Sequence, residues 1–554
     1  MQRSIAFVGA GPTTLYTLSA LLKEDTGPLR ISVFEEQDDA GLGGPYRPGW
    51  NDPAMLANIA SAEIPALAEP LLVWLQSRPP AELQKLRVDP QALDDRTFIP
   101  RVALGRYFRA QFEALISYGR RKGVDIDVRT RCRVIDVAVA AEGVVLTITP
   151  RRGMIENLIF DRVVLATGHQ WPAEQEVRPG YFLSPWPASA LSRIPPVSVG
   201  IRGSSLTAVD AAVALAGAHG EFVRTAAGLI YSPHANSEGF TITMMSRKGV
   251  LPEADFYFPL PHTPLAICSE AAIEGLILSG RPDLLDAAFD LFRQELIQVD
   301  PDYAEATGIR TATLEEFGER YFAGRAASDP FDWAAENLFE ARYNHQARVV
   351  VPWRYAILRM HESMAAIVPH LDGADFDSFN RHLKPVFVDT YGAVPHESIE
   401  RMLALHRAGR LRVMPLRDDY LIDTHRSERG VLVSRRGDDL HFPVFIEATG
   451  QRSMTALQFP FLSLLQQGVI RDDGADDSLT GSRGIMIDDD FHPMVNGVPV
   501  ERLFCLSLPF IMGRHPFIQG ITSSHEMGET VAGALTRSLT LPARGQWLMR
   551  AQAV

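Results

Sequence analysis

The chain has 554 residues, of which 46% are hydrophobic and 22% charged, and its formal net charge is −13. This length suits two or three domains of ordinary globular composition, and the acidic balance argues against nucleic acid or an anionic membrane as a partner. No stretch reaches the roughly 20 apolar residues of a membrane helix. The apolar run at the N-terminus is too short for a signal peptide, and the three cysteines show no CxxC spacing. Both features favour the cytoplasm.

The N-terminus predicts a strand, a glycine-rich turn, a helix and a second strand that ends at Glu35. The turn contains Gly9, Gly11, Pro12 and Thr13. This order is the dinucleotide-binding βαβ fingerprint, in which the glycines let the backbone approach a pyrophosphate at the helix N-terminus. Glu35 stands where a carboxylate accepts hydrogen bonds from a ribose 2′-OH, which favours FAD or NAD over NADP at this first site. The third glycine is absent, with Thr14 near its place.

Strands and helices alternate up to about residue 195. Helical patterns occur around Leu71–Gln76 and Leu104–Tyr118, and strand-like runs occur at Ile126–Val128, Val144–Ile148 and Val163–Leu165. The last of these runs ends in Ala166-Thr167-Gly168-His169.

A second strand, turn and helix begin near residue 197. The turn contains Gly203, Ser205 and Thr207, so serine replaces the middle glycine, and the next β-rich run ends just before Arg247. We expect a second nucleotide-binding domain here, although a βαβ unit that binds nothing would show the same pattern. The guanidinium of Arg247 is well placed for a 2′-phosphate and favours NADPH over NADH, unless it is an ordinary surface charge.

Residues from about 265 to 380 have mainly helical patterns, with amphipathic stretches at 284–292 and 353–368. We expect a helical insertion that caps a cleft. Strand patterns resume near Val386–Val388, Leu411–Met414 and Val431–Ser434, and a further strand ends in a second Ala-Thr-Gly at 448–450. A late strand at 503–506 and a helix around Ser524–Ala534 are expected to rejoin the first sheet.

These elements predict an α/β fold with two Rossmann-like dinucleotide-binding domains, for FAD and NAD(P)H, and a helical insertion. The FAD-binding domain is expected at 1–195 and 451–554. The NAD(P)H-binding domain is expected at 196–264 and 386–450, and the insertion at 265–385.

The chain resembles the flavoproteins with two dinucleotide-binding domains, and more closely the bacterial FAD/NAD(P)-binding family of YdhS-like proteins. The stretches that carry the resemblance are Met55–Ser61, Ala166–His169, Leu251–Tyr257, Val351–Tyr355 and Pro516–Gly520. The resemblance implies FAD in the first domain and NAD(P)H in the second. It supplies no substrate, but related flavin-dependent N-hydroxylating monooxygenases oxidise amino groups of small amino acids such as aspartate.

Several further residues are candidate cofactor contacts. The resemblance suggests that Asn58 faces FAD, whereas a turn-forming Asn is the alternative. Arg101 could bind cofactor phosphates or be a surface arginine at a helix start. No acid follows the late strand, where many of these flavoproteins have one for the ribityl chain, so Gln519-Gly520-Ile521 could offer backbone N–H groups to the flavin. The predicted cofactor-binding residues are therefore Gly9, Gly11, Pro12, Thr13, Glu35, Asn58, Arg101, Thr167, Gly168, Gly203, Ser205, Thr207, Arg247, Gln519, Gly520 and Ile521.

The preferred active-site candidates are His515 and Arg514, just before the expected flavin edge. His169 could bridge the cofactors or carry a proton, or be a packed histidine. Trp353 and Arg354 could bind an anionic substrate, and Asp255 lies in a loop that offers further substrate or proton-transfer groups. Each could instead be structural. No metal is expected, because the spaced histidines form no clear metal set.

The leading functional hypothesis is an FAD-dependent, NADPH-consuming monooxygenase. It would hydroxylate a nitrogen of a small amino-acid-like substrate through a C4a-hydroperoxyflavin, so its partners are that substrate and O₂. One alternative is an NAD(P)H-dependent reductase or dehydrogenase that passes electrons to a quinone or protein, because the same fold hosts both activities. Another is a flavoprotein whose redox state gates a partner. The oligomeric state stays open.

Overall fold

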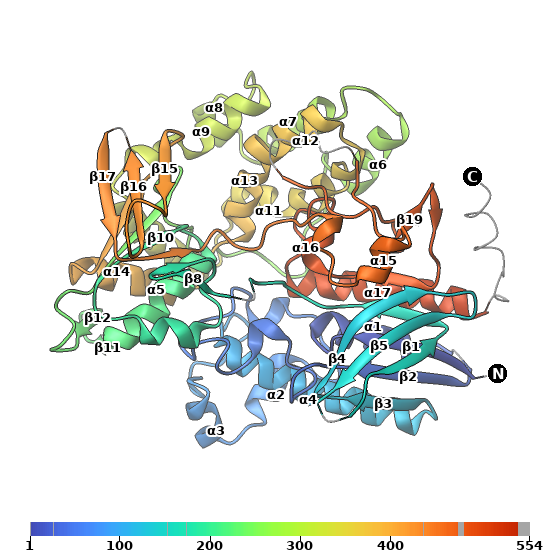
Figure 1. Cartoon of the computed structure of the whole chain (residues 1–554). Coiled ribbons are helices and arrows are strands. Elements are labelled where there is room, and N and C mark those ends of the chain that lie inside the picture. Colours follow the sequence, from blue (N-terminus) through green and yellow to red (C-terminus); the bar gives the residue numbers. More distant parts are fainter. Residues whose placement is uncertain are drawn as a thin grey trace.

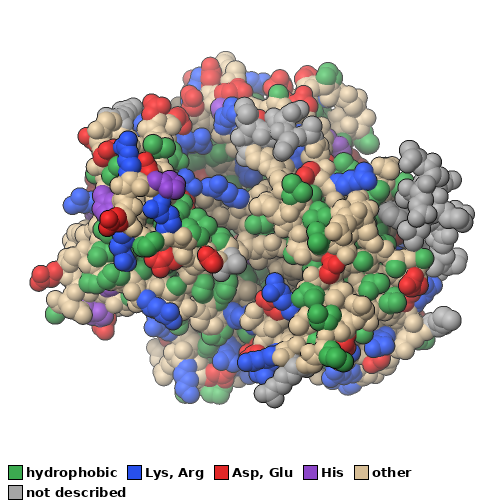
Figure 2. All heavy atoms as spheres, in the orientation of Figure 1, with side chains coloured by type: hydrophobic (Ala, Val, Ile, Leu, Met, Phe, Trp, Pro, Cys, Tyr) green, Lys and Arg blue, Asp and Glu red, His purple; other side chains and the backbone are tan. Residues whose placement is uncertain are grey.

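The computed structural model describes residues 2–25, 27–151, 153–172, 174–435, 437–474 and 481–540. Figure 1 shows three parts: one sheet with its helices at the lower right, a second sheet at the left, and a group of helices above both. Figure 2 shows that the same face is hollowed where these parts meet. Among the described residues, no helix combines the length and apolar character needed to span a membrane.

The first sheet is parallel, with strand order β21-β7-β1-β2-β3. Its strands are β1 (Arg3–Val8), β2 (Leu29–Phe34), β3 (Asp125–Arg129), β7 (Arg162–Leu165) and β21 (Leu503–Cys505). Ile5, Phe7 and Val33 are fully buried, as expected of apolar strands in a parallel sheet that is covered on both faces. The late strand β21 pairs with β7, so the C-terminal part of the chain rejoins the first sheet as predicted.

Helices of the first part surround this sheet. They are α1 (Pro12–Leu21), α2 (Leu71–Gln76), α3 (Pro80–Lys85), α4 (Arg101–Arg121), α15 (Leu462–Gln466), α16 (Leu508–Ile511) and α17 (Ile521–Thr540). An antiparallel sheet lies between β3 and β7 in sequence, made of β4 (Cys132–Val139), β5 (Val144–Pro150) and β6 (Glu156–Phe160). A short hairpin joins β19 (Met494–Val495) to β20 (Val498–Pro499).

The second sheet has the order β14-β13-β10-β18-β9-β8 and is parallel except at its β8–β9 edge. Its strands are β8 (Glu176–Arg178), β9 (Tyr181–Phe182), β10 (Ser198–Arg202), β13 (Thr241–Ser246), β14 (Leu411–Pro415) and β18 (Val444–Glu447). Helices α5 (Leu206–His219) and α14 (His396–Arg407) flank it. Two small antiparallel sheets extend it: β11 (Gly220–Thr225) with β12 (Gly228–Pro233), and β15 (Tyr420–Asp423), β16 (Val431–Arg435) and β17 (Asp438–Phe442).

The helical part lies between β13 and β14 in sequence. It contains α6 (Glu270–Leu278), α7 (Leu284–Val299), α8 (Pro301–Thr307), α9 (Leu314–Ala327), α10 (Pro330–Ala347), α11 (Pro352–Ala365), α12 (Gly373–Ser378) and α13 (Lys384–Tyr391). Figure 1 shows α7 to α9 and α11 to α13 above the two sheets.

One strand prediction in this region is wrong. Residues Val386–Val388 lie in α13, which follows a π-helical turn at Phe379–Leu383. Valine favours strands locally, but Val386 and Phe387 are fully buried within the helical core, and that packing outweighs the local preference.

Candidate functional site

The turn after β1 has the backbone geometry that a dinucleotide site requires. Gly9 has a φ of 100°, and a Cβ atom there would lie 2.3 Å from the carbonyl oxygen of Ala166. A Cβ at Gly11 would meet only the Cα of Gly43, at 3.5 Å, so packing within the protein does not demand glycine there. Gly11 therefore leaves room in front of α1, which is what a pyrophosphate would need.

The start of α1 leaves backbone donors available. Gly11 is the N-cap residue without a side-chain cap, and Pro12 occupies the first helical position. First-turn N–H groups have no partner within a helix, so this end attracts an anion. The hydroxyl of Thr14, which stands in place of the third glycine, donates to the Gly9 carbonyl at 2.7 Å and closes the turn.

Glu35 is buried at the end of β2, beside this turn. Its carboxylate accepts the N–H of Ala10 at 3.2 Å and of Gln37 at 3.0 Å, and it pairs with Arg47 at 3.2 Å. Burial raises the pKa of Glu35, against the opposing effect of Arg47. The carboxylate is thereby fixed beside the glycine turn, and its contact with a ribose hydroxyl stays a prediction. Sequence reasoning missed Arg47, which lies in the glycine- and proline-rich run 41–49.

Helix α17 runs parallel to α1, with its N-terminus at the same end. The hydroxyl of Thr13 donates to that of Ser524 at 3.3 Å, and a Cβ at Gly528 would lie 2.7 Å from the N atom of Thr17. Gln519 and Gly520 are exposed, and Ile521 begins α17. The N-termini of both helices therefore face one region, as the predicted roles of Gly11 and Gln519–Ile521 require.

The turn after β10 repeats the geometry of the first turn. Gly203 has a φ of 136°, and a Cβ there would lie 2.3 Å from the carbonyl oxygen of Ala448. Ser205 is the exposed N-cap residue of α5 and has no side-chain cap, and Thr207 lies in the first turn of that helix. Each glycine turn thus packs against an Ala-Thr-Gly turn, 166–168 in the first part and 448–450 in the second.

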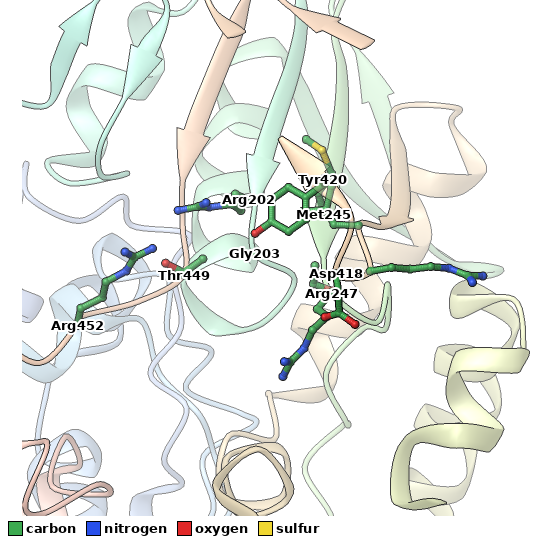
Figure 3. Close-up of a pocket in the computed structure, with 11 residues that line it drawn as sticks. Arg202, Gly203, Met245, Arg247, Asp418, Tyr420, Thr449 and Arg452 are labelled. Carbon is green, nitrogen blue, oxygen red and sulfur yellow. The ribbon is translucent and has the colours of Figure 1, made fainter. Parts of the chain in front are cut away.

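A pocket of about 420 Å³ lies at the carboxyl ends of β10, β13 and β14. In Figure 3, Tyr420 lies over the Gly203 turn, with Arg202, Thr449 and Arg452 on one side and Arg247 and Asp418 on the other. The remaining lining residues are Met245, Ser246, Leu416 and Arg417. The predicted contacts Gly203 and Arg247 are therefore brought together. Thr449 belongs to the second Ala-Thr-Gly turn, whereas the remaining pocket residues come from separate segments without a motif.

This pocket has an excess of positive charge. Arg202 pairs with Glu447 at 2.6 Å, but within the described part of the chain Arg247, Arg417 and Arg452 form no ion pair. Arg417 is tied to its neighbour, because its N–H donates to the carbonyl of Arg247 at 2.9 Å. Burial, followed by Arg247, lowers the pKa of the adjacent Lys248 to about 8. Such a cluster suits a dianionic phosphate.

The two nucleotide-binding parts touch at their Ala-Thr-Gly turns. The N–H of Gln170 donates to the side chain of Gln451 at 3.1 Å. His169 stands beside this contact, stacked on Trp171, and its buried Nδ1 atom lacks a hydrogen-bond partner among the described residues. Burial, helped by Arg101, lowers the pKa of His169 to about 4, so this imidazole is neutral near pH 7. Thr167 binds the hydroxyl of Ser507 at 2.7 Å.

Arg101 has a partner within the protein. Its guanidinium pairs with Asp210 of α5 at 2.7 Å and lies 5.8 Å from the Trp186 ring centroid, and its Nε donates to the carbonyl of Leu56 at 3.2 Å. Arg101 thereby links the two parts, and its predicted contact with a phosphate stays a prediction. Asn58 is half-buried, two residues after Leu56.

The preferred catalytic pair lies between α16 and α17. Arg514 pairs with Asp473 at 3.0 Å. His515 packs on Phe491, and its buried Nε2 atom is without a hydrogen-bond partner in the described ranges. Burial, then Arg514, lowers the pKa of His515 to about 4. At pH 7 this imidazole is neutral, and its low pKa makes it a weak base with no proton to give as an imidazolium acid.

The predicted substrate residues lie apart from the pair His515 and Arg514 in sequence and already have partners. Arg354 binds Glu253 at 3.1 Å and Glu340 at 2.9 Å, and it is 8% exposed. Trp353 stacks on Tyr303 with ring centroids 4.4 Å apart. Asp255 lies 3.0 Å from His345. The fold accounts for Trp353 and Arg354 through these contacts, and their binding of a substrate stays a prediction.

Comparison with known proteins identifies relatives across the whole chain. Residues 6–170 match a family model described as FAD-NAD(P)-binding, and residues 269–391 match the YdhS-like middle domain. The chain is 39% identical to the protein YdhS of Escherichia coli (strain K12) over 542 residues, which cover 97% of this chain and 98% of that protein.

Two solved structures share the fold. The ornithine N-hydroxylase of Kutzneria sp. 744 has a TM-score of 0.50 at 12% identity, covering 97% of this chain and all of its own. DfoA, the FAD-bound cadaverine monooxygenase of Erwinia amylovora, has a TM-score of 0.51 at 13% identity, covering 99% of this chain and 97% of its own. Such low identities show likeness of fold alone.

Proposed function

We propose that this chain, which belongs to the family of YdhS-like FAD/NAD(P)-binding proteins, is an NADPH-consuming flavin monooxygenase that hydroxylates a nitrogen of a small amine substrate. It is of the FAD/NAD(P)-binding flavoprotein class; the reaction is the proposal. The observation that carries the proposal is the repeated turn. Gly9 and Gly203 each pack against an Ala-Thr-Gly turn, and a hydrogen bond joins Gln170 and Gln451, which follow those two turns.

The residues of the first turn fit FAD. Gly11 leaves space that the protein itself does not need, the α1 N-terminus has unpaired donors by geometry, and Glu35 is held for a ribose. The N-terminus of α17 would face the pyrimidine edge through Gln519–Ile521. When bound, FAD would supply the oxygen chemistry, and the protein would position and shield it.

The residues of the second turn fit NADPH better than NADH. NADPH differs by a 2′-phosphate, and Arg247 and Arg417 lie in the same pocket, where no carboxylate of the described residues pairs with either of them. Phosphate recognition by guanidinium groups is bidentate and strong. NADPH would then supply the two electrons of the reaction as hydride.

Two observations favour a monooxygenase over a thiol-dependent reductase. The three cysteines, Cys132, Cys268 and Cys505, are buried and free, so no dithiol pair is available for electron relay. In addition, the ornithine N-hydroxylase and the cadaverine monooxygenase share the fold. The balanced reaction would be R–NH₂ + O₂ + NADPH + H⁺ → R–NHOH + H₂O + NADP⁺.

The test is oxygen incorporation. Purified protein is given NADPH, isotopically labelled dioxygen and a panel of diamines and amino acids. We expect one substrate to accelerate NADPH oxidation and to acquire one labelled oxygen atom, with little H₂O₂. NADPH oxidation that yields only H₂O₂ with every amine, together with rapid turnover of quinones or other electron acceptors, would instead establish the reductase.

A further inference from the structure

A cluster of two histidines and one aspartate lies where the helical part meets the second sheet. Asp255 follows Ala254, which forms a parallel bridge with Val394. The N–H of Asp255 donates to the Val394 carbonyl at 2.8 Å, and two residues later His396 begins α14. His345 comes from the last turn of α10. Backbone pairing and two helix ends therefore fix all three residues.

The side chains converge closely. Nε2 of His345 lies 3.0 Å from Oδ2 of Asp255, and the two imidazoles are nearly perpendicular, with ring centroids 4.9 Å apart. One ligand atom from each of the three residues lies within 4.8 Å of the others. The side chains of His345 and Asp255 are 17% and 14% exposed, so the cluster is largely shielded yet reachable.

A hydrogen bond does not account for the short approach between His345 and Asp255. The Nε2 atom of His345 is buried and has no hydrogen-bond partner in the described part of the chain, although the carboxylate oxygen is 3.0 Å away. Two ligands of one zinc ion, each about 2.0–2.2 Å from it in tetrahedral geometry, stand about 3.3–3.6 Å apart. At 3.0 Å the two atoms are within ion-pair distance for a protonated imidazole, and a small outward shift of the side chains would bring them to the spacing of two ligands of one ion.

The Asp255 carboxylate has no lysine or arginine partner among the described residues, and the nearby Arg342 pairs with Glu400 at 2.8 Å. Nε2 of His396 donates to the backbone carbonyl of Asp255 at 2.8 Å, which holds the ring in place. Histidine ligands at metal centres are held by such carbonyl contacts.

We propose that Asp255, His345 and His396 form a binding site for a divalent transition metal of the zinc class. Two imidazoles exclude magnesium and calcium, which take oxygen ligands, and suit zinc with three protein ligands and one open position. The ion would tie α10 and α14 to the segment that leaves the second sheet. It would act as a clamp, apart from both glycine turns, and it does not depend on the proposed reaction.

The experiment uses full-length protein freed of metal by a chelator and then titrated with Zn²⁺ alone. We expect one Zn²⁺ per chain for the natural protein. Asp255→Asn and His345→Gln should each weaken binding by at least about tenfold. His234→Gln changes an exposed histidine directly after β12, and this variant should bind Zn²⁺ as the natural protein does. No zinc binding by the natural protein, or equal binding by all variants, would overturn the proposal.

A second readout guards against variants that fold poorly. Zn²⁺ should raise the thermal midpoint of the natural protein and of His234→Gln, because a ligand that binds only the folded state stabilises it. Co²⁺ should give visible d–d absorption to the red of the flavin bands in the same two proteins. If the natural protein shows neither effect, the cluster is a packed Asp–His–His contact and the metal site is refuted.

Discussion

Gly9 and Gly11 are two residues apart, but a side chain would meet very different surroundings at each of them. At Gly9 the backbone is left-handed, with the Ala166 carbonyl against the missing side chain. At Gly11 the backbone is ordinary and the neighbouring protein atoms leave space. The first glycine therefore serves the fold, and the second leaves the space that the proposed FAD pyrophosphate would need.

The same substitution at the two glycines separates these roles. Gly9→Ala should lower the free energy of unfolding by about 2–4 kcal/mol, because the Cβ would sit 2.3 Å from a backbone oxygen at a strained φ. Gly11→Ala should leave the stability of the apoprotein within about 1 kcal/mol while lowering retained FAD at least about tenfold. Urea unfolding and the flavin absorbance of purified protein measure the two effects. Full FAD content in Gly11→Ala would place the pyrophosphate elsewhere.

Arg247 is expected to distinguish NADPH from NADH. It lines the pocket beside Gly203 and lacks a carboxylate partner in the described ranges. Arg247→Ala should weaken NADPH roughly tenfold, or about 1.4 kcal/mol, and should change NADH little. Titration of both nucleotides is the measurement, with the exposed Arg426→Ala as control. Equal losses for the two nucleotides would remove the case for 2′-phosphate recognition.

The lowered pKa of Lys248 leads us to expect that NADPH binding depends on pH. Its pKa is lowered to about 8, chiefly by burial and then by Arg247. A bound phosphate would raise this pKa. At pH values between the pKa of the free protein and that of the complex, Lys248 would therefore take up a proton when NADPH binds. Affinity should therefore be nearly constant below about pH 7 and decline as the pH rises through 8. Lys248→Met should flatten the profile; an unchanged slope would show that Lys248 does not sense the phosphate.

At the element scale, Arg101 joins helix α4 of the first part to α5 of the second through Asp210. Burial raises the pKa of Asp210 to about 6, with Arg101 opposing that rise. Arg101→Ala would leave this carboxylate buried without its closest cation, at a cost of about 3–5 kcal/mol near pH 7. Arg109→Ala on the same helix removes exposed ion pairs and should cost less than about 1 kcal/mol. Chemical unfolding of both variants checks the contrast.

The sign of the pH effect adds a second check on Arg101→Ala. A carboxyl whose folded pKa exceeds its unfolded value binds more protons when folded, so stability falls as the pH rises between the two values. In the natural protein that window runs from 3.8 to about 6. Without Arg101 the upper limit should move higher, so the deficit of the variant should shrink near pH 5. A deficit independent of pH would mean that Asp210 is not the group affected.

Elements defined by local pattern could be predicted from the sequence, and elements defined by distant packing could not. The strands ending at Glu35 and before Arg247 follow from apolar runs bounded by turn residues. The Val386–Val388 run looked the same locally, yet its burial against the helical part makes it a helix. The same limit hid the partner of Arg101 and the Asp255–His345–His396 cluster, since both depend on segments that meet only in the fold.

At the scale of the whole molecule, Phe517 connects the C-terminal part of the chain to the helical part. It is 8% exposed, and its ring lies within 5.7 Å of the rings of His361, Phe387 and Tyr391. Two residues later comes Gln519, which is expected to face the flavin. The helical part is therefore anchored beside the first nucleotide site, and a change in one should be felt in the other.

Phe517→Ala tests this coupling. Truncating a buried phenylalanine should lower the free energy of unfolding by about 3–5 kcal/mol. Because the cavity would open beside Gln519–Ile521, the variant should also lose FAD more readily, which dialysis followed by flavin fluorescence measures. Phe339→Ala removes a ring that is 77% exposed on α10 and should change neither property. If Phe517→Ala loses stability but holds FAD as tightly as the natural protein does, then the helical part packs against the segment before Gln519–Ile521 without influencing the affinity for FAD.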